Sequence, residues 1–73
     1  MFDKKEFAAN LRAARARLDM SLDELSEQTG ISANTLANYE SGNGYTPGAD
    51  KIANMCHALH VSPDWLFSWN KVA

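Results

Sequence analysis

The stretch from Ser21 to Gly42 constrains the fold most, because its residues predict two short helices joined by a tight turn. Ser21 and the glutamate three residues later, Glu24, form the S-x-x-E pattern of a capping box, which begins a helix. Gly30 stands where that helix must end, since glycine tolerates the left-handed conformation that terminates helices. Ser32 then offers an N-cap for a second helix. The stretch therefore predicts a helix, a turn and a helix in quick succession.

The second of these helices has two contrasting faces. Leu36 and Tyr39 are three residues apart and can face inward together. The positions between and beside them carry only small or amide side chains: Ala33, Asn34, Ala37 and Asn38. Such a face lets the helix backbone approach a partner closely, and it offers hydrogen-bond donors and acceptors with no charge to desolvate.

This pattern resembles the helix-turn-helix of the lambda repressor-like family, which includes phage repressors and their small antagonists. The resemblance covers nearly the whole chain, from about Phe7 to Phe67. The residues that match the family's typical run are Met20, Ser21, Leu25, Gly30, Ile31, Ser32, Leu36, Tyr39, Glu40 and Gly42. The resemblance implies an all-α, compact five-helix domain, with the helix-turn-helix itself at about residues 21–41.

The sequence before this stretch predicts one further helix. Asp3 can cap it, and Phe7, Leu11, Ala14 and Leu18 recur at steps of three and four residues, which is the apolar stripe of an amphipathic helix. The chain has 73 residues, so a single domain over residues 1–73 is expected. There is no strand-like alternation of useful length, and we expect no sheet.

The sequence after the helix-turn-helix predicts two more helices. The first begins near Gly48 or Ala49, ends at His60 and buries one face made of Ile52, Ala53, Cys56 and Leu59. Ser62 can cap the last helix, and Pro63 then occupies the first helical position that proline favours.

Charge and composition restrict the function. A formal net charge of −2 and a sequence pI of about 5.5 argue against nonspecific coating of nucleic acid, which needs a strongly basic surface. They are compatible with a site-specific binder whose few basic residues face one way. The sequence contains neither a long apolar run nor a signal peptide, and its lone Cys56 fits a reducing compartment. We therefore expect a cytoplasmic protein, and the starting Met1 and compact ending favour a complete regulator.

The resemblance also implies which residues contact DNA. Base readout is expected from the second helix of the helix-turn-helix, through Ala33, Asn34, Ala37 and Asn38. An asparagine amide can pair with adenine N6 and N7, and an alanine can contact a thymine methyl group. The alternative is that both asparagines are merely exposed to solvent.

Phosphate contacts are expected from Arg12, Arg15, Ser32, Thr35, Asn43, Tyr45 and Lys51. For any one of the charged residues, a solvated surface role is an equally good interpretation. The family often pairs an arginine at the position of Arg15 with a glutamate at the position of Glu40. Such a pair would orient the first helix against the third.

Two departures from the family pattern favour a different function. The family has a glutamine that contacts DNA where this chain has Leu22, and the loop before Pro47 is longer than usual. A protein-interaction module of the same fold, with weak or no DNA binding, is therefore the alternative hypothesis.

The aromatic end of the chain has two interpretations. Trp65, Phe67 and Trp69 can cover the bottom of the core, or they can form a patch through which two copies associate. We expect a homodimer, because two copies on half-sites one helical turn apart would combine two weak contacts.

Catalysis and metal binding have little support. Cys56, His57 and His60 form a C-H-x-x-H cluster, but a structural zinc site needs four ligands, and a free cysteine usually behaves as a small buried hydrophobe. We expect no enzyme activity, cofactor, metal or small-molecule ligand.

Taken with the family resemblance, the sequence predicts a transcription regulator, a repressor in the first instance, that binds an operator in double-stranded DNA.

Overall fold

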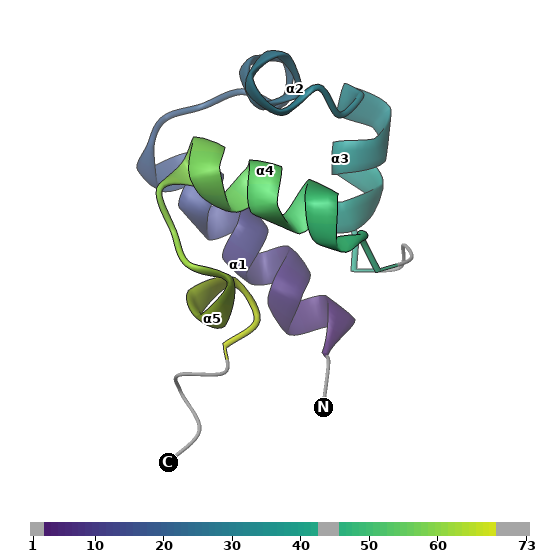
Figure 1. Ribbon diagram of the computed structural model, residues 1–73, viewed down its shortest axis with the longest axis vertical. Helices are drawn as coiled ribbons and strands as arrows, with labels where there is room; N and C mark the ends of the chain where they lie inside the picture. Colours follow the sequence, from purple (N-terminus) through teal and green to yellow (C-terminus); the bar gives the residue numbers. More distant parts are fainter. Residues whose placement is uncertain (1–2, 43–45, 69–73) are drawn as a thin grey trace.

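The computed structural model describes residues 3–42 and 46–68 and contains five α-helices in those ranges (Figure 1). In chain order they are α1 (Lys4–Arg17), α2 (Leu22–Thr29), α3 (Ala33–Glu40), α4 (Ala49–Leu59) and α5 (Pro63–Leu66). No strand occurs among these residues, and the predicted all-helical fold is confirmed. None of the described helices is long and apolar enough to cross a membrane.

Four of the helices begin, and two of the five end, at residues whose local chemistry predicts it. Side-chain oxygens of Asp3, Ser21, Ser32 and Ser62 each accept a backbone N–H from the first turn of the helix that follows. Gly30 ends α2 with φ of 75°, and His60 ends α4 with φ of 58°. Because these capping signals involve only neighbouring residues, they can be predicted from the sequence.

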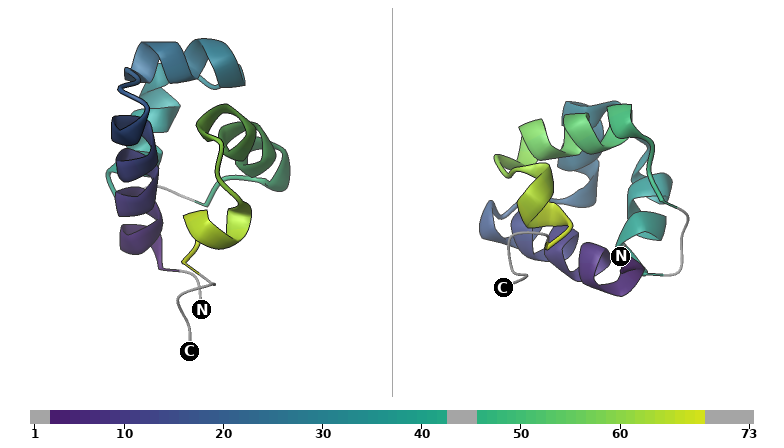
Figure 2. Two further views of the ribbon diagram at one scale, coloured as in Figure 1. Left: turned by 90° about the vertical axis from the view of Figure 1, so that its left-hand side faces the viewer. Right: turned by 60° about the horizontal axis from the view of Figure 1, so that its bottom comes forward.

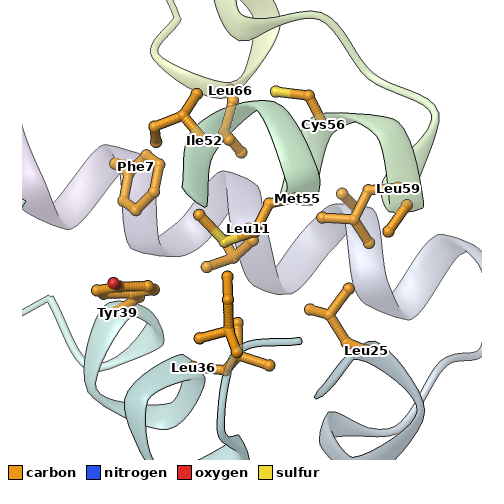
Figure 3. Packing of buried hydrophobic residues seen from close by; sticks show 13 residues of the cluster. Phe7, Leu11, Leu25, Leu36, Tyr39, Ile52, Met55, Cys56, Leu59 and Leu66 are labelled. Carbon is orange, nitrogen blue, oxygen red and sulfur yellow. The ribbon is translucent and has the colours of Figure 1, made fainter. Parts of the chain in front are cut away.

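A single core joins the helices. α1 packs against α3 and α5, α2 packs against α3 and α4, and α4 also contacts α5. The largest fully buried side chains come from all five helices: Leu11, Leu25, Leu36, Met55, Leu59 and Leu66. Figure 3 shows these side chains converging between the helices. The core therefore fixes the position of α2 through its packing on α4, and the position of α3 through its packing on α1.

Two predicted core positions are wrong. Leu18 is 38% exposed, because α1 ends at Arg17 and Leu18 is its C-cap, beyond the last full turn. Ala53 is exposed, because the buried face of α4 runs through Ile52, Met55 and Leu59, and Ala53 lies off that face. Met55 is fully buried in its place.

Asn10 is a buried polar residue that the sequence pattern did not reveal. Its Nδ2 atom lies 3.3 Å from the Trp65 carbonyl oxygen, 3.0 Å from the Leu66 carbonyl oxygen and 2.7 Å from Ser68 Oγ. These acceptors lie at the end of α5, where helical carbonyl groups lack partners within the helix. Asn10 of α1 therefore caps α5 across the interface between the two helices.

Aromatic contacts hold α5 on α1 as well. The rings of Phe7 and Phe67 stack with centroids 5.3 Å apart, and the guanidinium carbon of Arg17 lies 5.3 Å from the centroid of the Trp65 ring. The right-hand view of Figure 2 shows α5 lying beside α1 and α4. A helix of four residues cannot be stable alone, so these side-chain contacts with α1 stabilise it.

Candidate nucleic-acid interface

The turn between α2 and α3 is built from the backbone and one buried threonine. Thr29 Oγ1 donates to the Leu25 carbonyl oxygen at 2.8 Å and accepts from the Ile31 backbone N–H at 3.2 Å. Ile31 itself is buried. With Gly30 in the left-handed conformation, these bonds fix the direction in which α3 leaves α2. Thr29 was missed in the sequence because a threonine near a helix end has no distinctive pattern.

The faces of α3 separate as predicted from the spacing of its residues. Leu36 is fully buried and Tyr39 is 5% exposed, so this side of α3 is anchored in the core. Asn34, Ala37 and Asn38 are exposed on the other side. The four residues expected to read bases therefore lie on the solvent side of one helix, with Ala33 half-buried at its start: Ala33, Asn34, Ala37 and Asn38.

The start of α3 uses its hydroxyl groups internally. Ser32 Oγ accepts from the Thr35 backbone N–H at 3.2 Å and donates to Thr35 Oγ1 at 2.9 Å. Ser32 is exposed and Thr35 is half-buried. Both residues are close to Asn34 in the sequence, and their phosphate contacts stay predictions.

The end of α3 is held by two arginines from α1. Arg15 Nε lies 2.8 Å from Glu40 Oε2, and Arg15 Nη2 lies 3.0 Å from Glu40 Oε1, which is a bidentate ion pair. Arg15 Nη1 also donates to the Met20 carbonyl oxygen at 2.9 Å. Arg12 Nη1 donates to the Glu40 backbone carbonyl. The pair implied by the family resemblance is thus present, and Arg12 adds a third hydrogen bond at Glu40.

This arrangement places the two arginines at the C-terminal end of α3, whereas Asn34 lies in its first turn. Glu40 is 7% exposed, and its carboxylate raises the pKa of Arg15 by accepting its hydrogen bonds. Arg15 therefore stays charged, and it uses two of its five N–H groups on Glu40 and a third on the Met20 carbonyl oxygen. The phosphate contacts expected of Arg12 and Arg15 stay predictions.

The first turn of α2 carries an apolar residue and two acids where a phosphate-binding helix would present polar donors. Leu22 is half-buried against the core, so the residue in the place of the family's glutamine points inward. Ser21 Oγ accepts from the Glu24 backbone N–H at 3.1 Å, and Glu24 Oε1 accepts from the Ser21 backbone N–H at 2.9 Å. The bond from the Ser21 backbone N–H to the carboxylate lowers the pKa of Glu24, and Asp23 adds a second acid to the same turn.

The charges of the helix-turn-helix are all of one sign. Between Arg17 and Lys51 the sequence contains no lysine or arginine, but it contains six acidic residues: Asp19, Asp23, Glu24, Glu27, Glu40 and Asp50. Lys51 is about half exposed, with its Nζ 3.9 Å from Asp50 Oδ2, and a surface pair of this kind contributes little. Any binding of DNA by this part of the chain therefore relies on uncharged groups or on basic residues from elsewhere.

The remaining predicted site residues divide into two groups. Trp65 and Phe67 are half-buried and pack against the core, so much of their apolar surface is covered within one protomer. Asn43, Tyr45 and Trp69 lie outside the described residues. The dimer patch stays a prediction.

The cysteine and histidines do not gather into a metal site in the structure. Cys56 is buried, which raises the pKa of its thiol, while His57 and His60 are exposed. Within residues 3–42 and 46–68, no group of three or more histidine, cysteine, aspartate and glutamate residues could hold a metal ion.

Comparison with known proteins agrees with the fold. Comparison with curated proteins finds no significant match. The structure is similar to the restriction-modification controller protein C.AhdI from Aeromonas hydrophila, with 25% identity, a TM-score of 0.82 and coverage of 89% of this chain and 97% of that one. It is also similar to the clp gene regulator ClgR from C. glutamicum, with 27% identity, a TM-score of 0.79 and coverage of 100% and 96%.

A third similar structure is longer than this chain. It is an HTH_3 family transcriptional regulator from Vibrio cholerae, with 25% identity and a TM-score of 0.80, and the match covers 93% of this chain but 38% of that one. The family model described as a helix-turn-helix domain matches residues 8–71, which is most of the sequence. The chain therefore belongs to the helix-turn-helix domain family that is found in transcription regulators.

Proposed function

We propose that the protein regulates transcription by binding an operator in double-stranded DNA, with α3 in the major groove. The observation that carries this proposal is the exposed, uncharged face of α3, which presents Asn34, Ala37 and Asn38. The opposite side of the same helix is anchored by Leu36 and Tyr39 in the core. A rigid helix with exposed amides is suited to reading base edges, because the amides must be held in register with the base pairs.

The proposed readout uses both kinds of side chain on this face. The amide of Asn34 or Asn38 can donate to adenine N7 and accept from adenine N6, and the methyl group of Ala33 or Ala37 can contact a thymine methyl. Small side chains let the helix backbone lie deep in the groove. The same helix would thus bring donors, acceptors and apolar contacts to adjacent base pairs.

Repression and dimerisation complete the proposal. A domain bound over a promoter excludes polymerase without any further contact, so occlusion is the simplest mode of action. The similarity to the controller protein C.AhdI and the clp gene regulator ClgR supports a regulatory role. Two copies on one operator would compensate for the scarcity of basic residues in the helix-turn-helix.

Selection of bound duplexes from a random-sequence DNA pool at low salt, followed by sequencing, tests this function directly. We expect an enriched inverted repeat with half-site centres about 10 bp apart, as in dimeric helix-turn-helix proteins. An Asn34→Ala, Asn38→Ala double variant run in parallel should give no enriched repeat. Absence of enrichment with the native protein, even at low salt where phosphate attraction is strongest, would contradict the proposal.

The run of acidic residues favours one other candidate function. The helix-turn-helix carries no lysine or arginine, and α2 exposes Asp23, Glu24 and Glu27. An acidic surface of this kind suits a basic protein partner better than a phosphate backbone. If no DNA sequence is enriched, we propose that the protein is an interaction module, and affinity capture with an Asp23→Asn, Glu27→Gln variant as control would test it.

A further inference from the structure

The basic residues of the described chain are concentrated on α1. Five of the six described lysines and arginines lie on that helix, namely Lys4, Lys5, Arg12, Arg15 and Arg17, and the sixth is Lys51 on α4. Helices α2 and α3 contain none. If the helix-turn-helix binds DNA, the positive charge that attracts the phosphate backbone must come largely from α1.

Most of these cations already have partners within the protein. Arg12 and Arg15 bond to Glu40, the guanidinium of Arg17 lies over the Trp65 ring, and Lys51 lies beside Asp50. Lys4 and Lys5 are exposed, and neither forms an ion pair within residues 3–42 and 46–68. Among the described lysines and arginines, the two lysines in the first turn of α1 are therefore those with no ion pair, ring contact or side-chain hydrogen bond.

Lys5 lies against the chain at the end of α3. A Cβ atom built on Gly42 would lie 3.6 Å from Lys5 Cα, 3.6 Å from Lys5 Cγ and 3.8 Å from Ala8 Cβ. Gly42 has φ of 78°, a conformation that favours glycine, and the Lys5 and Ala8 atoms around it lie at ordinary van der Waals contact distances. The aliphatic part of the Lys5 side chain thus passes beside Gly42, which follows the C-cap of α3. Lys5 is not among the residues expected from the sequence to contact phosphates.

We propose that Lys5 binds a DNA phosphate beside the end of α3 and supplies a positive charge that the helix-turn-helix itself lacks. This inference rests on the proposed function. When the first turn of a recognition helix contacts base edges, its C-terminal end leads out of the groove toward the sugar–phosphate backbone. An ammonium on a flexible four-carbon stem beside that end can reach a phosphate oxygen, and it fixes position without reading sequence.

Salt dependence of operator binding measures such a contact. Lys5→Gln removes one positive charge, and Lys4→Gln is the matched control because it removes the same charge from the neighbouring exposed residue. The affinity of each variant for the selected operator is measured from low to physiological salt. We expect Lys5→Gln to reduce the magnitude of the slope of log K against log salt by about 0.9, and Lys4→Gln to leave it nearly unchanged.

Two further measurements, of binding to different operators and of thermal unfolding, separate loss of a phosphate contact from loss of base readout and from misfolding. Lys5→Gln should weaken binding by the same factor on operators that differ in base sequence, and thermal unfolding should show that both variants fold as the native protein does. An unchanged slope for Lys5→Gln, or equal changes for both variants, would overturn the inference while operator binding persists. Failure of the native protein to bind any DNA sequence would instead overturn the proposed function and this inference with it.

Discussion

Arg15 of α1 binds both carboxylate oxygens of Glu40, the last residue of α3, at 2.8 and 3.0 Å. The carboxylate is nearly buried, whereas the arginine side chain is 24% exposed. A half-buried bidentate pair is geometrically demanding, since both partners must hold one relative orientation. It therefore fixes the direction of α3 relative to α1, and the same end of α3 also receives the bond from Arg12.

Glu40→Gln should lower the free energy of unfolding by about 1–3 kcal/mol, because hydrogen bonds to charged groups contribute this much and the variant loses the negative partner of Arg15. Urea unfolding followed by circular dichroism measures the change. Glu27→Gln, which removes an exposed acid from α2, is the control and should change stability by less than about 0.5 kcal/mol. Equal stability of the Glu40 variant and the native protein would show that the pair does not hold the interface.

Asn10→Asp should destabilise the protein more than Asn10→Ala does. The amide nitrogen of Asn10 donates toward two carbonyl oxygens and a hydroxyl, and an aspartate would present only oxygen acceptors to the same carbonyl groups. We expect Asn10→Ala to cost about 1–3 kcal/mol, because the Leu66 carbonyl loses its Asn10 donor while the Trp65 carbonyl keeps the Ser68 backbone N–H. Asn10→Asp should cost more at neutral pH.

Thermal unfolding of both Asn10 variants at pH 7 checks this order. Asn34, an asparagine exposed on α3, gives the control, since Asn34→Asp should leave stability nearly unchanged. An Asp variant as stable as the Ala variant would mean that α5 rearranges around position 10.

The elements that could be predicted from sequence are those whose causes are local. Ser21, Gly30 and Ser32 act on their own neighbours, so the caps and the turn follow from residue type and spacing. Leu36 and Tyr39 were placed in the core by the helical repeat, which needs no knowledge of the rest of the chain. The two faces of α3 follow from the same repeat.

The features that escaped prediction depend on residues far away in the sequence. Nothing near Asn10 indicates that its amide will meet the end of α5, and nothing near Arg12 indicates that it will meet the carbonyl of Glu40. Leu18 was misplaced because the helical repeat does not state where α1 ends. The position of Lys5 beside Gly42 could not be predicted from the sequence, because the two lie 37 positions apart and only the fold brings them together.

Trp69→Ala should weaken dimerisation while leaving the fold intact, whereas Phe67→Ala should weaken the fold itself. Phe67 stacks on Phe7 and packs against the core, so its removal loses buried contacts within one protomer, at a cost of about 2–4 kcal/mol. Trp69 is the residue of the predicted dimer patch that lies outside the described residues. Sedimentation velocity over a range of concentrations, with thermal unfolding alongside, separates the two effects. A Trp69 variant that sediments as the native protein does would count against the patch.

Asn34→Ala should weaken operator binding by about 1–3 kcal/mol and relax specificity at one base pair, because a bidentate amide contact distinguishes adenine from the other bases by this amount. The exposed position of Asn34 in the first turn of α3 means that the substitution leaves the core and the cap of Ser32 unchanged. Fluorescence anisotropy with the selected operator, with single-base-pair variants of it and with a scrambled duplex measures both effects. His57→Ala, an exposed substitution on α4, serves as the control and should bind as the native protein does. If Asn34→Ala lowered affinity for the operator and the scrambled duplex by equal factors, the amide would contribute to general attachment and α3 would not read that base.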